Sequence, residues 1–423
     1  MAEAARLSET PAGIRVVTET VPGMRSVALG FWVRTGSRDE VPAEAGVSHF
    51  LEHLLFKGTP SLTTVEISEF LDGIGAQFNA FTSKEATNLH ARFLDRHLED
   101  AFGVLGDMFL RPAMSEIDSE RQVVVEEIAM YEDDPDSKAH DLIAEAVFGE
   151  TPLGRPIIGC SEVIESISPE RIREYHDERY SGASIVISAA GNLDHDALVE
   201  MAGRLAPGTA GAIPIEAVAP PKDGKVTGFE KDTEQYHLVV ATPGIDRGDE
   251  RRFALAILDA ILGGSTSSRL FRKVREERGL AYSVGTYAEQ YTDTGLFAIH
   301  TGTRGENLSE VCEILAAEMR QIAREAPTTE EIDRARELVK GRIVLAEESN
   351  AARMARIGRA ALHDLPILTL DEMIERIDAV DGEAVVDLAA EILGQGKPSA
   401  ACVGPDTALF AEAASAFEAV GGS

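Results

Sequence analysis

Residues 115–132 of the chain read SEIDSERQVVVEEIAMYE, and residues 330–347 repeat the pattern as EEIDRARELVKGRIVLAE. In both stretches Glu-Ile-Asp is followed by an arginine at the same offset, and the apolar positions keep the same register. A second match places residues 48–55, SHFLEHLL, over residues 255–262, LAILDAIL. Repetition at two separate places indicates that the chain contains two copies of one folding unit.

Both copies also run through the same predicted order of elements. An apolar strand (residues 27–33 or 237–241) leads to a helix, a pair of strands and two or more helices, and a β-rich segment ends each copy (residues 185–190 or 399–403). This order predicts an α+β fold of two homologous domains, in each of which helices cover a mostly antiparallel sheet.

The boundary between the copies is marked by residues 206–226, which are rich in proline, glycine and alanine and have no amphipathic periodicity. Such a composition predicts a partly extended linker. We therefore expect an N-terminal domain of residues 1–205 and a C-terminal domain of residues 227–423.

The composition limits the partners and the compartment. The 423 residues include 40 Lys and Arg against 72 Asp and Glu, a formal net charge of −32, so we expect no nucleic-acid partner. Cys160, Cys312 and Cys402 lie far apart without a CxxC pair, which favours a reducing compartment. No apolar stretch approaches the roughly 18 residues of a membrane span. The sequence therefore predicts a soluble, cytoplasmic protein without a membrane partner.

Residues 49–53 read HFLEH and lie within the predicted first helix of copy one. Because residues four apart lie on one helix face about 6 Å from each other, the imidazoles of His49 and His53 can reach one metal ion. Glu52 lies beside them, where it could take a proton from an attacking water without being a ligand. A catalytic zinc ion takes three protein ligands and keeps one position open, so a third ligand is required. The competing interpretation is a chance match, with a frequency on the order of a few per cent.

Copy two supports a chemical role for the histidines. Its aligned helix has Ala256 and Ala260 where copy one has the two histidines, and Asp259 where copy one has Glu52. A helix with the same apolar pattern therefore does not need the histidines, which argues against a purely structural role.

The same comparison selects candidate acidic ligands. Glu120 and Glu127 are seven residues apart, two turns along one face of the predicted 115–132 helix. Copy two has Ala335 and Arg342 at those positions. A solvated acidic helix face would be the ordinary explanation for either glutamate alone. Because both are lost together with the histidines, both are candidates for the metal site.

Residues 46–59, GVSHFLEHLLFKGT, together with residues 120–127, ERQVVVEE, resemble the inverted-motif zinc peptidases, the pitrilysin and mitochondrial processing peptidase group. The resemblance spans nearly the whole chain. It implies that Glu127 is the third zinc ligand and that Glu120 supports the site from outside the ligand set. Glu126 is the alternative ligand, but the seven-residue spacing and the alignment with copy two favour Glu127.

Copy two carries a signature of its own in residues 268–283, SRLFRKVREERGLAYS. The family keeps an arginine and a tyrosine seven residues apart here, which match Arg275 and Tyr282. The resemblance implies that they contact the substrate backbone and the developing oxyanion, and a guanidinium and a phenol are suitable donors for a carbonyl that gains negative charge. Arg272 and Arg278 are nearby alternatives, and an exposed basic helix face is the simpler interpretation.

Residues 75–83, GAQFNAFTS, resemble the family's strand beside the metal. In that family the substrate is held there as an added β-strand, so that main-chain hydrogen bonds provide the affinity. The matching positions, expected to bind substrate, are Asn79, Ala80 and Phe81.

The resemblance implies a zinc-dependent endopeptidase whose two domains enclose a chamber, with the metal in the first domain and substrate-positioning residues in the second. The expected cofactor is Zn²⁺, and the expected residues are His49, His53 and Glu127 for the metal and Glu52, Tyr282 and Arg275 for catalysis. A chamber of limited size favours short or unfolded peptides, and the acidic balance of the chain makes basic peptides the hypothesised preference.

Shorter relatives pair two chains to close the chamber. Because both half-sites are intact here, we expect a homodimer, with a heteromer of this chain and a related chain as the alternative. The competing function is a non-catalytic peptide-binding or scaffold subunit of the same fold. A metal-free interaction protein with an accidental motif would bind no zinc.

Overall fold

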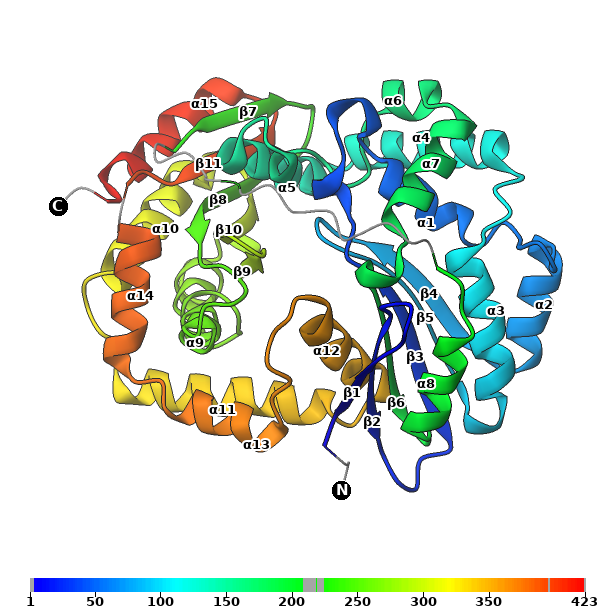
Figure 1. The fold of residues 1–423 in the computed structure, drawn as a ribbon. Helices are drawn as coiled ribbons and strands as arrows, with labels where there is room; N and C mark the ends of the chain where they lie inside the picture. The colour runs from blue at the N-terminus through cyan, green and yellow to red at the C-terminus, as the bar shows by residue number, and fades with distance from the viewer. Residues whose placement is uncertain (1–3, 208–217, 219–223, 395, 422–423) are drawn as a thin grey trace. The chain divides into compact units, whose positions relative to one another are not determined.

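The computed structural model describes residues 4–207, 218, 224–394 and 396–421, so most of the expected linker (206–226) lies outside the described residues. The chain forms two compact units (Figure 1). The first contains Met1–Ala129, Pro156–Glu216 and Val344–Thr369, and the second contains Met130–Arg155, Ala217–Ile343 and Leu370–Ser423. Within the described residues, no helix combines the length and the apolar character that crossing a membrane requires.

The first unit is built on a six-stranded sheet. Its strands lie in the order β1-β2-β6-β3-β5-β4, and all neighbours are antiparallel except β2 and β6. The strands are Arg6–Glu9 (β1), Arg15–Thr20 (β2), Ser26–Val33 (β3), Gln77–Thr82 (β4), Thr87–Leu94 (β5) and Ile185–Gly191 (β6). The helices are Val47–Leu54 (α1), Thr64–Gly73 (α2), Leu98–Leu110 (α3), Ile117–Asp133 (α4), Ser161–Ser166 (α6), Pro169–Arg179 (α7), His195–Gly203 (α8) and Asn350–Leu362 (α12).

The second unit repeats this sheet without a counterpart of β1. Its strands lie in the order β7-β11-β8-β10-β9, and only β7 and β11 are parallel. They are Val226–Glu230 (β7), Tyr236–Gly244 (β8), Ala281–Gln290 (β9), Gly295–Thr303 (β10) and Ser399–Gly404 (β11). The helices are Pro135–Phe148 (α5), Arg252–Leu262 (α9), Leu308–Ile322 (α10), Thr329–Ala346 (α11), Leu370–Asp378 (α13), Gly382–Gly394 (α14) and Thr407–Ala413 (α15). The matching strand orders confirm the duplication and the mostly antiparallel α+β fold.

The central strand β3 is covered on both of its faces. Successive side chains of a strand point to opposite faces of the sheet. Val27, Leu29 and Phe31 belong to the main core of the first unit, whereas Ala28 and Trp32 belong to a second cluster that includes α12. A strand that is buried on both faces has a nearly continuous apolar sequence, which explains why this segment is recognisable from its sequence.

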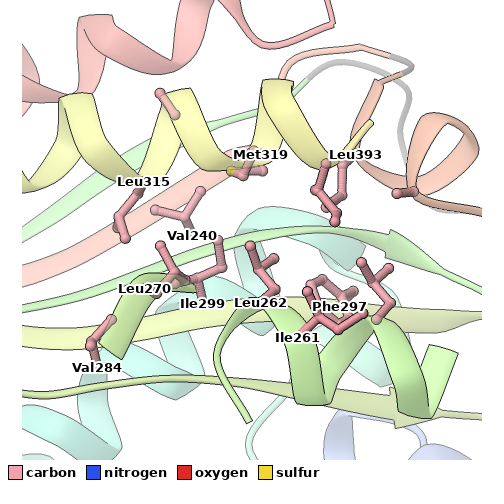
Figure 2. Packing of buried hydrophobic residues seen from close by; sticks show 14 of the residues in the cluster. Val240, Ile261, Leu262, Leu270, Val284, Phe297, Ile299, Leu315, Met319 and Leu393 are labelled. Carbon is pink, nitrogen blue, oxygen red and sulfur yellow. The ribbon is translucent and has the colours of Figure 1, made fainter. Parts of the chain in front are cut away.

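The core of the second unit shows the corresponding packing. Figure 2 shows Val240 of β8, with Ile299 of β10 next to it, facing Leu315 and Met319 of α10, and all four side chains are almost completely buried.

Two helices pack on a sheet formed by the other half of the sequence. The helix α5 follows α4 in the N-terminal half, but it packs on β8 and β11 of the second unit. The helix α12 follows α11 in the C-terminal half, but it packs on β2, β3 and β6 of the first unit (Figure 1). The compact units are therefore not the continuous halves 1–205 and 227–423 expected from the sequence, because the pattern within a copy does not record which sheet each helix covers.

Candidate metal centre

The short helix α1 presents its polar side chains together because its apolar side chains are buried in the core of the first unit. The buried apolar residues of this helix are Val47, Phe50, Leu51 and Leu54. The opposite side carries His49, Glu52 and His53, and all three are half-buried or nearly buried. Core packing of one face therefore orients the candidate metal-binding face.

The start of α1 is fixed by hydrogen bonds from outside the helix. Glu40 accepts hydrogen bonds from the backbone N–H groups of Gly46 (2.8 Å) and Ser48 (2.7 Å). A carboxylate at this end satisfies amide donors that have no partner inside the helix. Gly46 has a φ of 97°, and a Cβ there would lie 2.6 Å from the carbonyl oxygen of Ile158. The helix therefore begins at one defined place.

Helix α4 places the third candidate ligand beside the histidines. The Oε2 atom of Glu127 lies 3.2 Å from Nε2 of His53 and 3.8 Å from Nε2 of His49. Glu126, the alternative ligand from the sequence, is exposed. Among the described residues, His49, His53 and Glu127 are the one group of three whose potential ligand atoms all lie within 4.8 Å of one another.

These three side chains fit a zinc ion. Zinc binds imidazole nitrogen and carboxylate oxygen at about 2.0–2.2 Å in a tetrahedral arrangement, which separates neighbouring ligand atoms by about 3.3 Å. The observed separations of 3.2 Å and 3.8 Å are close to that value. Two histidines and one glutamate also leave a fourth position open, as catalytic zinc sites do.

The surroundings keep His49 neutral. Burial, together with the neighbouring His53, lowers the pKa of His49 to about 4. The imidazole therefore keeps its lone pair near neutral pH, which metal binding requires. The Nδ1 atom of His49 is buried and has no hydrogen-bond partner among the described residues.

Glu120 contacts His53 from the side away from Glu127. Its Oε1 atom lies 2.8 Å from Nδ1 of His53, and its Oε2 atom lies 2.6 Å from Nζ of Lys57. A carboxylate bound to the second ring nitrogen of a metal-binding histidine fixes the ring orientation and the tautomer. The position of Glu120 thus agrees with the supporting role that the resemblance implies.

The candidate base, Glu52, is held by the end of strand β4. Thr82 donates a hydrogen bond from Oγ1 to Oε2 of Glu52 at 2.7 Å. Burial raises the pKa of the Glu52 carboxyl above its usual range, and the hydrogen bond from Thr82 and the nearby His53 offset part of this rise. A carboxyl with a raised pKa is better matched to proton transfer near neutral pH.

The second unit keeps the carboxylate–threonine pair and lacks the candidate ligands. Asp259 of α9 accepts a hydrogen bond from Oγ1 of Thr286 in β9 at 2.6 Å. Arg342, at the position of Glu127, donates to the backbone oxygen of Gly264. The pair between Asp259 and Thr286 shows that this contact joins helix to strand in both units, whether or not metal ligands are present.

Asn79, Ala80 and Phe81 lie on β4, at the edge of the first sheet. Ala80 is buried, whereas Asn79 and Phe81 are exposed. The backbone N–H of Ala80 donates to Oδ1 of Asn79 at 2.9 Å. Because β4 pairs only with β5 among the described strands, its other edge is suited to an added strand.

Arg275 and Tyr282 lie together in the second unit. Arg275 belongs to the π-helix Phe271–Glu276, and its guanidinium lies 4.6 Å from the ring centre of Tyr282. Tyr282 is 78% exposed. The alternative arginines have carboxylate partners, Glu277 for Arg272 (3.3 Å) and Glu310 for Arg278 (2.7 Å). Within the described residues Arg275 has no carboxylate partner, which favours it as the arginine available to a substrate.

Sequence reasoning missed two residues of this site, Lys57 and Thr82. The copy comparison contains a signal for Lys57, since Gly264 stands at its position in copy two. Thr82 is matched by Thr286 only after the strands are paired in three dimensions, so no sequence offset identifies it.

The site is a helix-borne group of two histidines and one glutamate in a duplicated α+β fold. Residues 15–161 match the family model described as insulinase (peptidase family M16), and residues 166–339 match the model described as the peptidase M16 inactive domain. The chain belongs to peptidase family M16, which confirms the resemblance drawn from the motifs. The second family model is described as an inactive domain, which agrees with the absence of the candidate ligands from copy two.

Several relatives match over almost their whole length. An uncharacterized zinc protease of Streptomyces coelicolor is 40% identical over 412 residues, covering 95% of this chain and 89% of the relative. An uncharacterized zinc protease of Bacillus subtilis is 40% identical over 394 residues, covering 90% and 93%. One of Mycobacterium tuberculosis is 38% identical over 418 residues, covering 95% and 93%. These names agree with the expected zinc ion.

Solved structures share the fold at lower sequence identity. A peptidase M16 inactive domain from Pseudomonas fluorescens has a TM-score of 0.90 at 22% identity, covering 96% of this chain and 99% of that chain. A protease from Helicobacter pylori has a TM-score of 0.87 at 19% identity, covering 95% and 99%. Both support the two-unit α+β architecture.

The geometry predicts different effects for two adjacent glutamates. Glu127→Gln should weaken zinc binding by more than about 100-fold, since loss of a ligand exceeds the 10- to 100-fold effect of a supporting residue. Glu126→Gln changes an exposed side chain of the same helix and should leave the zinc affinity unchanged. Competition with a chromophoric chelator measures both, and equal affinities of the two variants would contradict the assignment.

Proposed function

We propose that this chain is a zinc-dependent endopeptidase that binds zinc through His49, His53 and Glu127. The observation that carries the proposal is the convergence of these three side chains beside the half-buried carboxylate of Glu52. Membership of family M16 and the names of the relatives support zinc protease chemistry. Bound zinc would polarise the scissile carbonyl and lower the pKa of the attacking water.

Glu52 is the general base of the proposed reaction. Oε2 of Glu52 accepts a hydrogen bond from Thr82. Oε1 of Glu52 has no hydrogen-bond partner among the described residues, so this oxygen is available for proton transfer. Glu52 accepts a proton as the water attacks and returns it to the leaving amine. Its raised pKa favours the protonated form that the second step requires.

Residues away from the metal hold the substrate. The free edge of β4, with Asn79, Ala80 and Phe81, binds the peptide as an added strand, so that main-chain groups provide most of the affinity. Arg275 and Tyr282 donate to the carbonyl oxygen that gains negative charge. This mode of binding suits short or unfolded peptides, because most strands of a folded protein already have their main-chain groups paired within a sheet.

The first test is cleavage of a quenched basic peptide by the purified protein, with and without a zinc chelator. Glu52→Gln keeps the shape of the side chain but cannot take the proton. This variant should retain one zinc ion per chain and lose about 10²- to 10⁴-fold in kcat. Zinc content and cleavage rate are measured on the same preparations.

The outcome also separates the two candidate functions. Chelator-sensitive cleavage that is lost in the zinc-replete Glu52→Gln variant supports the endopeptidase. Peptide binding with zinc but without cleavage in the natural chain would favour the non-catalytic peptide-binding subunit, an alternative that the family matches leave open. A natural chain that binds no zinc would overturn both the metal assignment and the enzyme.

The second unit can be tested through one hydroxyl group. Tyr282→Phe should lower kcat by about 10²- to 10³-fold, because it removes one donor to the developing oxyanion. Zinc affinity should not change. Tyr131→Phe alters another exposed tyrosine and serves as the control. A Tyr282→Phe variant with the full kcat would remove this residue from the mechanism.

Substrate charge provides a further test, since the formal net charge of the chain is −32. A lysine-rich quenched peptide should have a kcat/KM about 10-fold or more above that of a glutamate-rich peptide of the same length, owing to electrostatic attraction. Added salt should reduce the difference because it screens exposed charges. Equal rates at low salt would rule out the preference for basic peptides.

The expected homodimer, the enclosed chamber and the cytoplasmic location stay predictions. They affect which peptides reach the site, whereas the residues of the metal centre lie within one unit.

A further inference from the structure

We propose that Lys57 is a positioning residue of the zinc site, which acts by holding Glu120 against His53. This inference rests on the proposed function, because it assumes that His53 binds zinc. Nothing in the HFLEH motif or in the candidate ligand set includes Lys57, which lies beyond the end of α1.

The contacts form a chain of three links. Nζ of Lys57 lies 2.6 Å from Oε2 of Glu120, and Oε1 of the same carboxylate lies 2.8 Å from Nδ1 of His53. Nε2 of His53 then lies 3.2 Å from Oε2 of Glu127. One end of the carboxylate is therefore bound by the lysine and the other end orients the imidazole.

Burial makes the lysine contact more important than an ordinary surface ion pair. The side chain of Glu120 is only 7% exposed, and that of Lys57 is 24% exposed. A carboxylate that is shielded from water requires partners for both oxygens, and removal of one partner from a buried pair is costly. Without Lys57, Oε2 would have to find another donor, and rotation toward that donor would take Oε1 away from His53.

The backbone holds Lys57 in place independently of the metal. Its N–H donates to the carbonyl oxygen of Leu54 at 3.1 Å, which continues the turn at the end of α1. The next residue, Gly58, has a φ of 95°, and its carbonyl oxygen accepts a hydrogen bond from the N–H of Ala113 at 2.9 Å. The lysine therefore starts from a fixed backbone position beside α4.

The duplication assigns Lys57 to the metal residues rather than to the common framework. In copy two, Gly264 stands at the position of Lys57, Ala335 at that of Glu120 and Ala260 at that of His53. A Cβ on Gly264 would lie 2.3 Å from Oδ2 of Asp259, so a side chain there would displace that carboxylate. The three linked residues are thus all missing from the copy without ligands, whereas the carboxylate–threonine pair is retained.

The test measures zinc affinity by competition with a chromophoric chelator. Lys57→Met removes the charge at similar length and should weaken zinc binding by about 10- to 100-fold, the usual effect of a residue that supports a ligand. Lys57→Arg keeps a donor for Glu120 and should recover most of the affinity. Zinc affinity within about twofold of the natural chain in Lys57→Met would overturn the inference.

A matched lysine serves as the control. Lys340 of α11 is 20% exposed, and its Nζ lies 2.6 Å from Glu337 and 2.8 Å from Asp378. Lys340→Met therefore removes a lysine of similar exposure, paired with exposed carboxylates, from the helix that corresponds to α4, and it should leave zinc affinity unchanged. An equal loss of affinity in Lys340→Met and Lys57→Met would show a general effect of lost lysine charge and overturn the inference.

A double-mutant cycle tests whether Lys57 acts through Glu120. Glu120→Gln should weaken zinc binding by itself, and Lys57→Met should add little in that background. Additive losses would overturn the proposed route through Glu120. Thermal unfolding with and without a chelator separates a positioning role from a purely structural one. Lys57→Met should lower the melting temperature more in the zinc-bound protein than in the metal-free protein. An equally large decrease in both forms would contradict the positioning role.

His53→Ala distinguishes failure of this inference from failure of the proposed function. If zinc binding does not depend on His53, the proposed function fails and this inference fails with it. If His53→Ala abolishes zinc binding while Lys57→Met binds zinc normally, only the role of Lys57 is wrong.

Discussion

Helix α1 has eight residues and one apolar stripe, and burial of that stripe determines which way the candidate metal-binding side chains face. Full burial of a large apolar side chain contributes about 1.5–3 kcal/mol, so rotation of the helix about its axis would cost several such contributions. The carboxylate of Glu40 fixes where the helix begins, and Thr82 ties its polar face to β4. The positions of His49 and His53 therefore follow from packing and hydrogen bonds that do not involve the candidate ligand atoms.

The two copies show which parts of the site belong to the fold and which belong to the chemistry. The hydrogen bond between Glu52 and Thr82 has a counterpart in Asp259 and Thr286, so an acidic residue at this place also has a structural reason to exist. The histidines and the two α4 glutamates have no such counterpart in copy two. Arg342 stands at the position of Glu127 and donates a hydrogen bond to the backbone oxygen of Gly264. Copy two therefore has a guanidinium cation at the place where copy one could bind a metal cation.

Much of the fold could be predicted because its decisive signals are local. The apolar run of β3, the repeated helices and the HFLEH spacing are all read within about 20 residues, and the structure has the corresponding elements. The parallel pairing of β2 with β6 was not predicted, because it joins segments from opposite ends of a copy. For the same reason the contact of Lys57 with Glu120 was missed, since these residues are far apart along the chain and meet only through the packing of α1 and α4.

Each of the helices α5 and α12 packs on the sheet of the other half of the sequence, and this affects how the chain folds during its synthesis. One face of the first sheet, with Trp32 among its buried side chains, is covered by a helix that is synthesised more than 300 residues later, and Arg15 pairs with Asp364 across 349 positions. Contacts between such distant segments close slowly because a long loop must be ordered first. The first half cannot cover both faces of its sheet while it is alone at the ribosome, because α12 has not yet been made. The chain therefore requires nearly its full length before its first sheet is covered, which ties the folding of the copy with the candidate ligands to the synthesis of the copy without them.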